Sequence, residues 1–431
     1  MIYIPFRTYF CVLALSAILL LQPAHAEEKL TLSICIDAAL RNHPGIKTAS
    51  ANVAASRGQE TQAASPYFPQ LRASTGYSES HASGALGDTV NKSYSTTLSA
   101  SQLLYDFGRT GSALDAVQAD FRASELERER AVQDVVLGVK QAYYSLLQAG
   151  KKAMIAQKTL EQAESHLRQA ETFFRAGTKP RFDVTQAEVE VNNARLGVIN
   201  AKNNVRLEQI ALNNAMGTDP AARVTIEDVL FVKVDVPALD QALEEAIRNR
   251  PEMRKAEAGI EAAQARVKAE RSNYFPNISA SGSYTWATGT SEMGMFRGDI
   301  GDSWNAGVTL TIPLFEGGLT RGRVSEARAN LIALEAQRDS LKQIVLLEVN
   351  RAYADIENAV ARIDVMESSL KKAREYLEIA QGRYQAGVGP YIEVTDAQVS
   401  ADKAETDFVQ AQYDYQLSVA RLEKAMGRMK Q

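Results

Sequence analysis

The chain has 431 residues, enough for one to three domains of ordinary size. Hydrophobic residues make up 45% and charged residues 23%, which excludes a wholly disordered chain and a multi-span helical membrane protein. The 48 Lys and Arg residues against 52 Asp and Glu give a net charge of -4, which provides no basic footprint for nucleic acid. Two cysteines and four histidines are too few for a disulfide scaffold or a Cys/His zinc module.

The N-terminus has the pattern of a secretory signal peptide. Arg7 precedes an apolar run from Tyr9 to Leu21, and the small-residue sequence Ala24-His25-Ala26 follows. The run is shorter than the ~20 residues that a membrane-spanning helix needs, so cleavage is favoured over an uncleaved anchor. We therefore expect residues 1–26 to be removed and the mature chain to be exported. It contains no other apolar stretch of ~20 residues, so a membrane segment would have to be a β-barrel.

The rest of the chain is duplicated. Asn-His-Pro at 42–44 returns as Asn-Arg-Pro at 249–251, and Tyr-Phe-Pro at 67–69 returns at 274–276, both 207 positions later. Ala-Met-Gly at 215–217 returns at 425–427, now 210 positions later. We expect one protomer over 27–431 with a first repeat at about 33–217 and a second at about 239–427. Residues 217–237 form an insert between them.

Each repeat predicts the same elements in the same order. An Ala-rich helix, at 33–65 and at 239–273, ends before Tyr-Phe-Pro because proline disfavours helix at the preceding residue. Alternating apolar and polar residues then predict two strands in each repeat, within 68–105 in the first and within 275–314 in the second. Helices at 109–216 and 319–427 follow, with a turn near the middle of each range. Apolar residues at seven-residue intervals predict a coiled-coil seam in these helices: Val139, Leu146, Ala153, Leu160 and Leu167 in the first repeat, and Val349, Ile356, Ile363, Leu370 and Leu377 in the second.

The turns between the long and the returning helices carry glycine and proline. Gly177 and Gly387 suit the left-handed residue that closes a helix, and Pro180 and Pro390 suit the first turn of the next helix. Within the insert, Val224 to Ile226 are compatible with one short strand.

Motifs for catalysis or cofactor binding are weak. A glycine-rich turn at 317–323 resembles a phosphate-binding loop, but Arg323 replaces the required lysine and Val324 replaces the required Ser or Thr. The histidines lack metal-ligand spacing, and no Ser-His-Asp or Cys-His arrangement is evident. We therefore expect no cofactor, no metal and no enzymatic activity. Trp286 and Trp304 on the predicted strands fit either a core or the aromatic girdle of a barrel.

Acidic residues follow the two predicted turns. Glu393 and Asp396 are three apart, on one face of the returning helix, and Asp183 occupies the place of Glu393 in the first repeat. Acids in a first helical turn also stabilise the positive end of the helix dipole. The sequence leaves open whether these three acids have more than this structural role.

This order of parts resembles the TolC family of outer-membrane efflux and secretion channels. The resemblance covers residues 33–427 and is carried by duplicated motifs: Tyr105-Asp-Phe-Gly108 and Phe315-Glu-Gly-Gly318 after the strands, Phe174-Arg-Ala-Gly177 with Asp183-Val184, and Tyr384-Gln-Ala-Gly387 with Glu393-Val394. It implies a mainly α protein with a membrane β-barrel. In a homotrimer, four strands per protomer would close a twelve-stranded barrel. Twelve helices would continue it as a periplasmic tunnel, with the 217–237 insert in an equatorial girdle.

The resemblance also implies a function. The protein would be the outer-membrane channel of a tripartite efflux pump or type I secretion system, a passive conduit contacting outer-membrane lipid. Its partners would be a periplasmic adaptor and an inner-membrane RND or ABC transporter, with no nucleic acid. The adaptor would contact the turns at Gly177, Pro180, Gly387 and Pro390. The alternative from another class is a soluble periplasmic coiled-coil adaptor or scaffold protein.

Finally, the resemblance implies a gate at the periplasmic end. The family's closing tyrosine corresponds to Tyr384, the acid that accepts its bond to Asp183, and the acids lining the constriction to Glu393 and Asp396. The family's closing arginine falls at Gly389, so one closing link of the gate is missing. Six carboxylates facing one narrow pore predict cation selectivity and block by trivalent cations.

Overall fold

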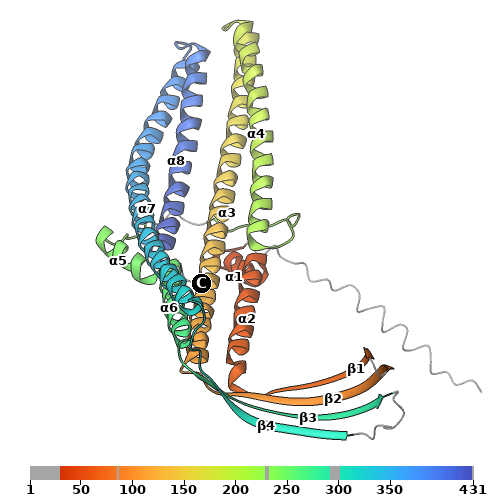
Figure 1. The fold of residues 1–431 in the computed structure, drawn as a ribbon. Helices are drawn as coiled ribbons and strands as arrows, with labels where there is room; N and C mark the ends of the chain where they lie inside the picture. The colour runs from red at the N-terminus through yellow and green to blue at the C-terminus, as the bar shows by residue number, and fades with distance from the viewer. Residues whose placement is uncertain (1–29, 85–86, 229–232, 292–300, 430–431) are drawn as a thin grey trace, which may run out of the picture. The chain divides into compact units, whose positions relative to one another are not determined.

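The computed structural model describes residues 30–84, 87–228, 233–291 and 301–429. The predicted signal peptide at 1–26 lies outside these residues. The expected order of elements is confirmed in both repeats (Figure 1). In the first repeat these are α1 Leu32–Asn42, α2 Pro44–Ala64, the 3-10 turn η1 Ser65–Tyr67, β1 Gln70–Gly84, β2 Gly87–Tyr105, α3 Arg109–Arg175 and α4 Arg181–Met216. In the second they are α5 Leu239–Asn249, α6 Pro251–Ser272, β3 Asn277–Ser291, β4 Gly301–Thr311, α7 Leu319–Gln385 and α8 Tyr391–Ala425.

The first helix of each repeat is divided, where a single helix was expected. The break falls at His43 before Pro44 and at Arg250 before Pro251, and both preceding residues are extended, with ψ of 125° and 129°. A proline offers no N–H to the preceding turn and forces its neighbour out of the helical region. The same two prolines therefore begin α2 and α6, where their missing N–H groups cost nothing.

The described chain forms two compact units. Unit 1 contains residues up to 41, 139–233 and 366–413, and unit 2 contains 42–138, 234–365 and 414 onward. Unit 1 holds the ends of the two helical hairpins, α3 with α4 and α7 with α8. Unit 2 holds the sheet and the helices that flank it in sequence.

The sheet of unit 2 is antiparallel, with strand order β1-β2-β3-β4. Its register places Ala73, Leu98, Tyr284 and Trp304 in one row across the four strands. The adjacent row, which faces the opposite side because side chains alternate, consists of Ser74, Thr97, Thr285 and Ser303. In these rows one face is therefore apolar and aromatic and the other carries hydroxyl groups, while Thr75, Thr96 and Asp302 follow on the first face.

The long helices contribute most of the core. At the predicted seven-residue positions, Val139, Leu146, Val349, Ile356, Ile363 and Leu370 are all buried. Ala153, Leu160, Leu167 and Leu377 are only half-buried. Among the described helices, none combines the length and apolarity required to cross a membrane.

The short strand expected within 217–237 is reduced to a single bridge in unit 1. Leu30 pairs in parallel with Ile226, through N–H groups of Leu30 and Glu227 that donate over 2.8 and 3.0 Å. Tyr143 of α3 donates its hydroxyl to the Glu227 carbonyl at 2.7 Å and fixes this segment against the helix.

Candidate functional site

Both helical hairpins reverse direction through the same glycine turn. Gly177 and Gly387 have φ of 74° and 76°, in the left-handed region that other residues enter only at a steric cost. The N–H of Thr178 donates to the Phe173 carbonyl at 3.0 Å, and the N–H of Val388 donates to the Arg383 carbonyl at 3.1 Å. These are the bonds of a Schellman motif, which satisfies the last carbonyls of a helix. Glycine thus ends α3 and α7 as the sequence predicts.

The prolines of the turns lie one residue outside the returning helices. Pro180 is the N-cap of α4, with φ of -76° and ψ of 158°, and the helix begins at Arg181. Likewise α8 begins at Tyr391, directly after Pro390. The expected position in the first turn is therefore wrong by one residue. The extended proline still ensures that each chain turns sharply before the helix starts.

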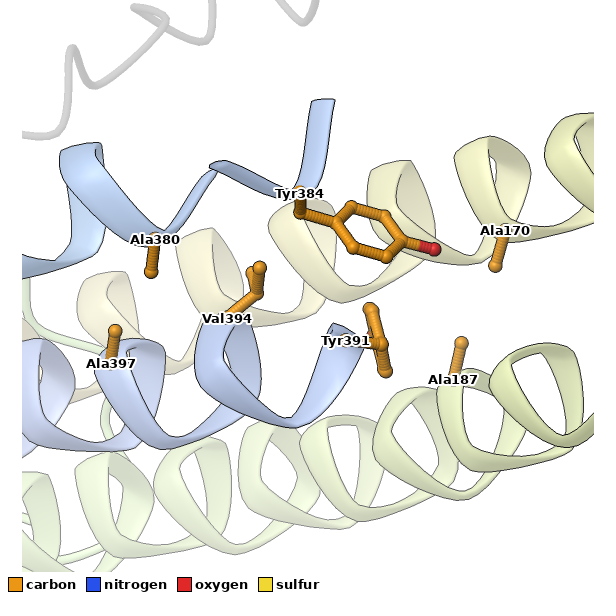
Figure 2. Packing of buried hydrophobic residues seen from close by; sticks show 7 residues of the cluster. All are labelled: Ala170, Ala187, Ala380, Tyr384, Tyr391, Val394 and Ala397. Carbon is orange, nitrogen blue, oxygen red and sulfur yellow. The ribbon is translucent and has the colours of Figure 1, made fainter. Parts of the chain in front are cut away.

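A buried aromatic cluster lies beside these turns in unit 1 (Figure 2). Tyr384 and Tyr391 are 1% and 2% exposed, and their ring centroids are 5.4 Å apart. The Phe173 ring lies 5.7 Å from that of Tyr384. Small residues complete this tip cluster and let the helices approach closely: Ala170, Ala187, Ala380, Val394 and Ala397.

Lys179 of the first turn connects to the second turn. Its ammonium group lies 5.1 Å from the centroid of the Tyr384 ring, a cation–π distance, and donates to the Gly389 carbonyl at 3.2 Å. The two hairpin ends are thus held together by one side chain as well as by the tip cluster.

The hydroxyl of Tyr384 is buried and has no hydrogen-bond partner among the described residues. Burial, together with the negative charge of Asp183, raises the pKa of Tyr384 to about 12, so the phenol stays neutral at physiological pH. Asp183 is 8% exposed in the first turn of α4. The structure therefore places the two predicted gate residues within electrostatic reach, but no hydrogen bond joins them in this protomer.

Because the Tyr384 hydroxyl makes no bond, we expect Tyr384→Phe to leave the thermal stability of the assembled protein unchanged or slightly raised. A buried unsatisfied hydroxyl costs about 1–3 kcal/mol, and the substitution removes it without changing the ring. Tyr391→Phe is the matched control and should destabilise. A loss of more than about 1 kcal/mol in Tyr384→Phe would show that the hydroxyl has a partner in the assembly.

Sequence reasoning missed the polar centre of this region, which is Glu190 on α4. Its carboxylate accepts hydrogen bonds from the hydroxyls of Tyr391 and Thr395, both at 2.6 Å. Burial and the bond to Glu190 raise the pKa of Tyr391. Glu190 follows Asp183 by seven residues and therefore shares its helix face, which is the one signal in the sequence that points to it.

The two acids of α8 differ in their surroundings. Glu393 is half-buried and its Oε2 lies 3.1 Å from Nε of Arg383, whereas Asp396 is exposed. A Cβ at Gly389 would lie 3.1 Å from the Arg383 Cβ and 3.3 Å from the Glu393 carboxylate. The absence of a side chain at 389 thus leaves room for this ion pair, and Arg383 places a guanidinium beside the predicted constriction.

A cleft of about 470 Å³ continues from the tip cluster along α3, α4 and α8. It is lined by His166, Glu190 and Asp402 among others. Burial lowers the pKa of His166 and raises that of Asp402. The Asp402 carboxylate accepts hydrogen bonds from the Thr159 hydroxyl at 3.0 Å and from the Gln398 amide at 2.9 Å. The bond to Thr159 connects α8 with α3 across the cleft.

The sequence is similar to curated outer-membrane proteins, among them the toluene efflux pump outer membrane protein TtgF of Pseudomonas putida, which is 28% identical over 414 residues. Outer membrane protein OprJ of Pseudomonas aeruginosa is 29% identical over 413 residues, covering 91% of this chain and 83% of OprJ. Protein CyaE of Bordetella pertussis is 28% identical over 402 residues, covering 93% of this chain and 83% of CyaE.

Solved structures share the fold. The MtrE outer membrane channel of Neisseria gonorrhoeae, in its open state, matches with a TM-score of 0.76 at 25% identity, covering 92% of this chain and 88% of MtrE. The CmeC outer membrane channel of Campylobacter jejuni matches in fold with a TM-score of 0.80 at 20% identity, over 93% of this chain and 87% of CmeC. The model of the outer membrane efflux protein family matches residues 35–218 and 242–428, the two repeats in turn. The chain belongs to the outer membrane efflux protein family.

Proposed function

We propose that the protein is the passive exit duct of a tripartite efflux pump or a type I secretion system. Its strands would lie in the outer membrane and its helices would extend into the periplasm. An inner-membrane RND or ABC transporter would supply the energy through a periplasmic adaptor, and this chain would catalyse no reaction. The observation that carries the proposal is the two-faced sheet in a chain of this family.

The apolar face of the sheet is uncovered in the protomer. Leu71 is 74% exposed, Trp304 73% and Val308 67%. Such a face is stable against lipid, while the opposite face of serine and threonine suits a water-filled lumen. This arrangement favours the girdle interpretation of Trp304 over a core position.

The edges of the sheet argue for a homotrimer. Strands β1 and β4 each have one edge without a partner in the described sheet. Unpaired backbone groups are not tolerated in lipid, so the edges must pair with other copies. Three copies of a four-stranded sheet would close the twelve-stranded barrel that the sequence predicts.

The helices offer independent support for self-association. On α4, Phe182, Val189 and Leu196 recur every seven residues and are 72%, 54% and 57% exposed. A heptad stripe of this kind is the usual seam of a helix–helix contact. Nothing in the described chain buries this stripe, and a neighbouring protomer in a helical tunnel would do so.

We assign adaptor docking to the two turns. Gly177, Pro180, Gly387 and Pro390 are all exposed, and a Cβ at either glycine would meet nothing within 4 Å. Val388 beside them is 71% exposed, which gives the turn an apolar contact point. The tip cluster beneath would keep both turns rigid and therefore ready for docking.

Fractionation of expressing cells tests this proposal against a soluble periplasmic scaffold. We expect the mature chain in the outer-membrane fraction of a density gradient, resistant to extraction by carbonate and released by detergent as a trimer. Recovery of the intact chain in the soluble periplasm would contradict the channel and support the scaffold.

A further inference from the structure

A cavity of about 460 Å³ lies in unit 2 where the helices adjoin the second pair of strands. Arg271 in the last turn of α6 and Arg321 and Arg328 on α7 line it, together with the aromatic residues Tyr274 and Phe275. Arg321 and Arg328 are seven residues apart, so they lie on one face of α7 about 10 Å apart along its axis. Three guanidinium groups therefore converge on one cavity, which we call the arginine cavity.

The charges of the arginine cavity are not balanced within the described chain. No carboxylate lines it, and no described acid forms an ion pair with any of its three arginines. Of the acids nearby in sequence, Glu270 accepts from the Asn273 amide at 2.9 Å and Glu316 accepts from the Thr320 hydroxyl, while Glu326, between the two arginines of α7, does not line the cavity. Other arginines of unit 2 have partners, such as Arg254 with Glu129 at 3.5 Å. An anion from outside the protomer would neutralise the positive charge of the cavity.

The first repeat shows that the fold does not require these arginines. The positions equivalent to Arg271, Arg321 and Arg328 are Ala64, Gly111 and Gln118. Tyr67 packs so closely there that a Cβ at Gly111 would lie 3.2 Å from its hydroxyl.

Gln118, which occupies the position of Arg328 in the first repeat, has a hydrogen-bond partner within the protomer. The amide of Gln118 donates to the Glu60 carboxylate at 3.1 Å. The equivalent of Glu60 in the second repeat is Val267. At these aligned positions the second repeat has three arginines where the first repeat has none, and a valine in place of Glu60.

The position of the cavity identifies the anion. Phe275 precedes the first residue of β3 by two positions, and Tyr274 and Phe275 are 52% and 53% exposed. Leu314 and Phe315, after β4, are 91% and 90% exposed. Exposed aromatics at the end of membrane strands mark the headgroup level, where the available anions are lipid phosphates. Arginine is suited to them because its planar fork binds phosphate oxygens in pairs.

We propose that the arginine cavity binds the phosphate of an anionic phospholipid headgroup in the periplasmic leaflet of the outer membrane. This inference rests on the proposed function, because it needs the strands in lipid. The aromatic rings would contact the glycerol and upper acyl carbons while the guanidinium groups hold the phosphate. The protein would carry one such lipid per protomer, all beside the second repeat.

The test uses the purified trimer and native mass spectrometry after delipidation. The trimer is titrated with phosphatidylglycerol or phosphatidylcholine in mixed micelles. We expect the wild type to bind about one phosphatidylglycerol per protomer in preference to phosphatidylcholine. Arg271→Gln/Arg321→Gln/Arg328→Gln should weaken that binding by more than about tenfold, because several charge-assisted bonds are removed. Arg122→Gln/Arg254→Gln/Arg362→Gln, whose residues are paired with Glu261, Glu129 and Asp414, removes the same charge and should bind like the wild type.

Three results would overturn the lipid assignment. Equal retention of phosphatidylglycerol by the wild type and the cavity variant would show that the arginines do not bind it. Displacement of the lipid by inorganic phosphate at equal concentration would show a site for a free anion. Dissociation of the cavity variant into monomers in lipid-free detergent would show a subunit contact. Channel conductance is expected to be the same in the wild type and in both triple variants. A wild type that shows no conductance would count against the proposed function and not against lipid binding in the arginine cavity.

Discussion

Removal of the two α8 carboxylates is expected to weaken block of the channel by trivalent cations at least about tenfold. In Glu393→Gln/Asp396→Asn the side chains keep their shape, and the proposed trimer would lose six carboxylates at one constriction. Rings of acids concentrate cations and bind multivalent ones most strongly. We expect hexaamminecobalt added from the periplasmic side to lose at least about tenfold in blocking affinity, or ~1.4 kcal/mol, in planar bilayers.

The surroundings of the two acids predict that they contribute unequally. Nε of Arg383 lies 3.1 Å from Oε2 of Glu393, so the guanidinium offsets part of the Glu393 charge. Asp396 is exposed, and no described cation forms an ion pair with it. Asp396→Asn alone should therefore weaken block more than Glu393→Gln alone. Glu405→Gln/Asp407→Asn removes the same charge farther along α8 and serves as the control. An unchanged block in the double variant would place the selectivity ring elsewhere.

Replacement of Gly387 by arginine is expected to abolish export while the trimer still assembles. The position has φ of 76°, where a side chain costs about 1–2 kcal/mol, and a Cβ there meets nothing within 4 Å. That strain is small for an assembled trimer, so the main effect is a bulky cation on the proposed docking surface. Export is measured as restored resistance in a deletion strain, over a panel of toxic compounds, and assembly as trimer extracted from membranes.

Two variants separate docking from backbone strain. Gly387→Asn should retain export, because asparagine adopts the left-handed conformation more readily and is small. Gly58→Arg places the same side chain on α2, where a Cβ also meets nothing within 4 Å, and should be neutral. Normal export by Gly387→Arg would exclude docking at this turn, and failure of Gly387→Asn would indicate that the turn geometry itself is required.

Much of the fold could be predicted because helices and strands follow from patterns of residues close together in the sequence. The seven-residue spacing from Val349 to Leu370 and the alternation around Trp304 each reflect one repeated geometry, helix or strand. Duplication strengthened every such assignment, since each pattern occurred twice. The glycine turns could be predicted as well, because glycine is the residue that most readily adopts the left-handed conformation after a helix end. Gly177 and Gly387 both have that conformation.

What escaped prediction depends on contacts between distant segments. Glu190 bonds Tyr391, which lies 201 positions away, and nothing in either helix alone selects that partner. Proline was predicted to end the first helix of each repeat only before Tyr-Phe-Pro, yet Pro44 and Pro251 also divide that helix in two. The arginine cavity became visible only when its residues from α6 and α7 were brought together and compared with Gly111 and Gln118.

Single-channel recording tests the central claim most directly. The purified wild-type protein, added to a planar lipid bilayer with a potassium chloride gradient, should insert to give discrete, long-lived conductance steps with a reversal potential that shows cation selectivity. The steps should require the trimer and no nucleotide or other energy source. Absence of conductance from trimers that are demonstrably inserted in the bilayer would contradict the account of this protein as a passive export duct.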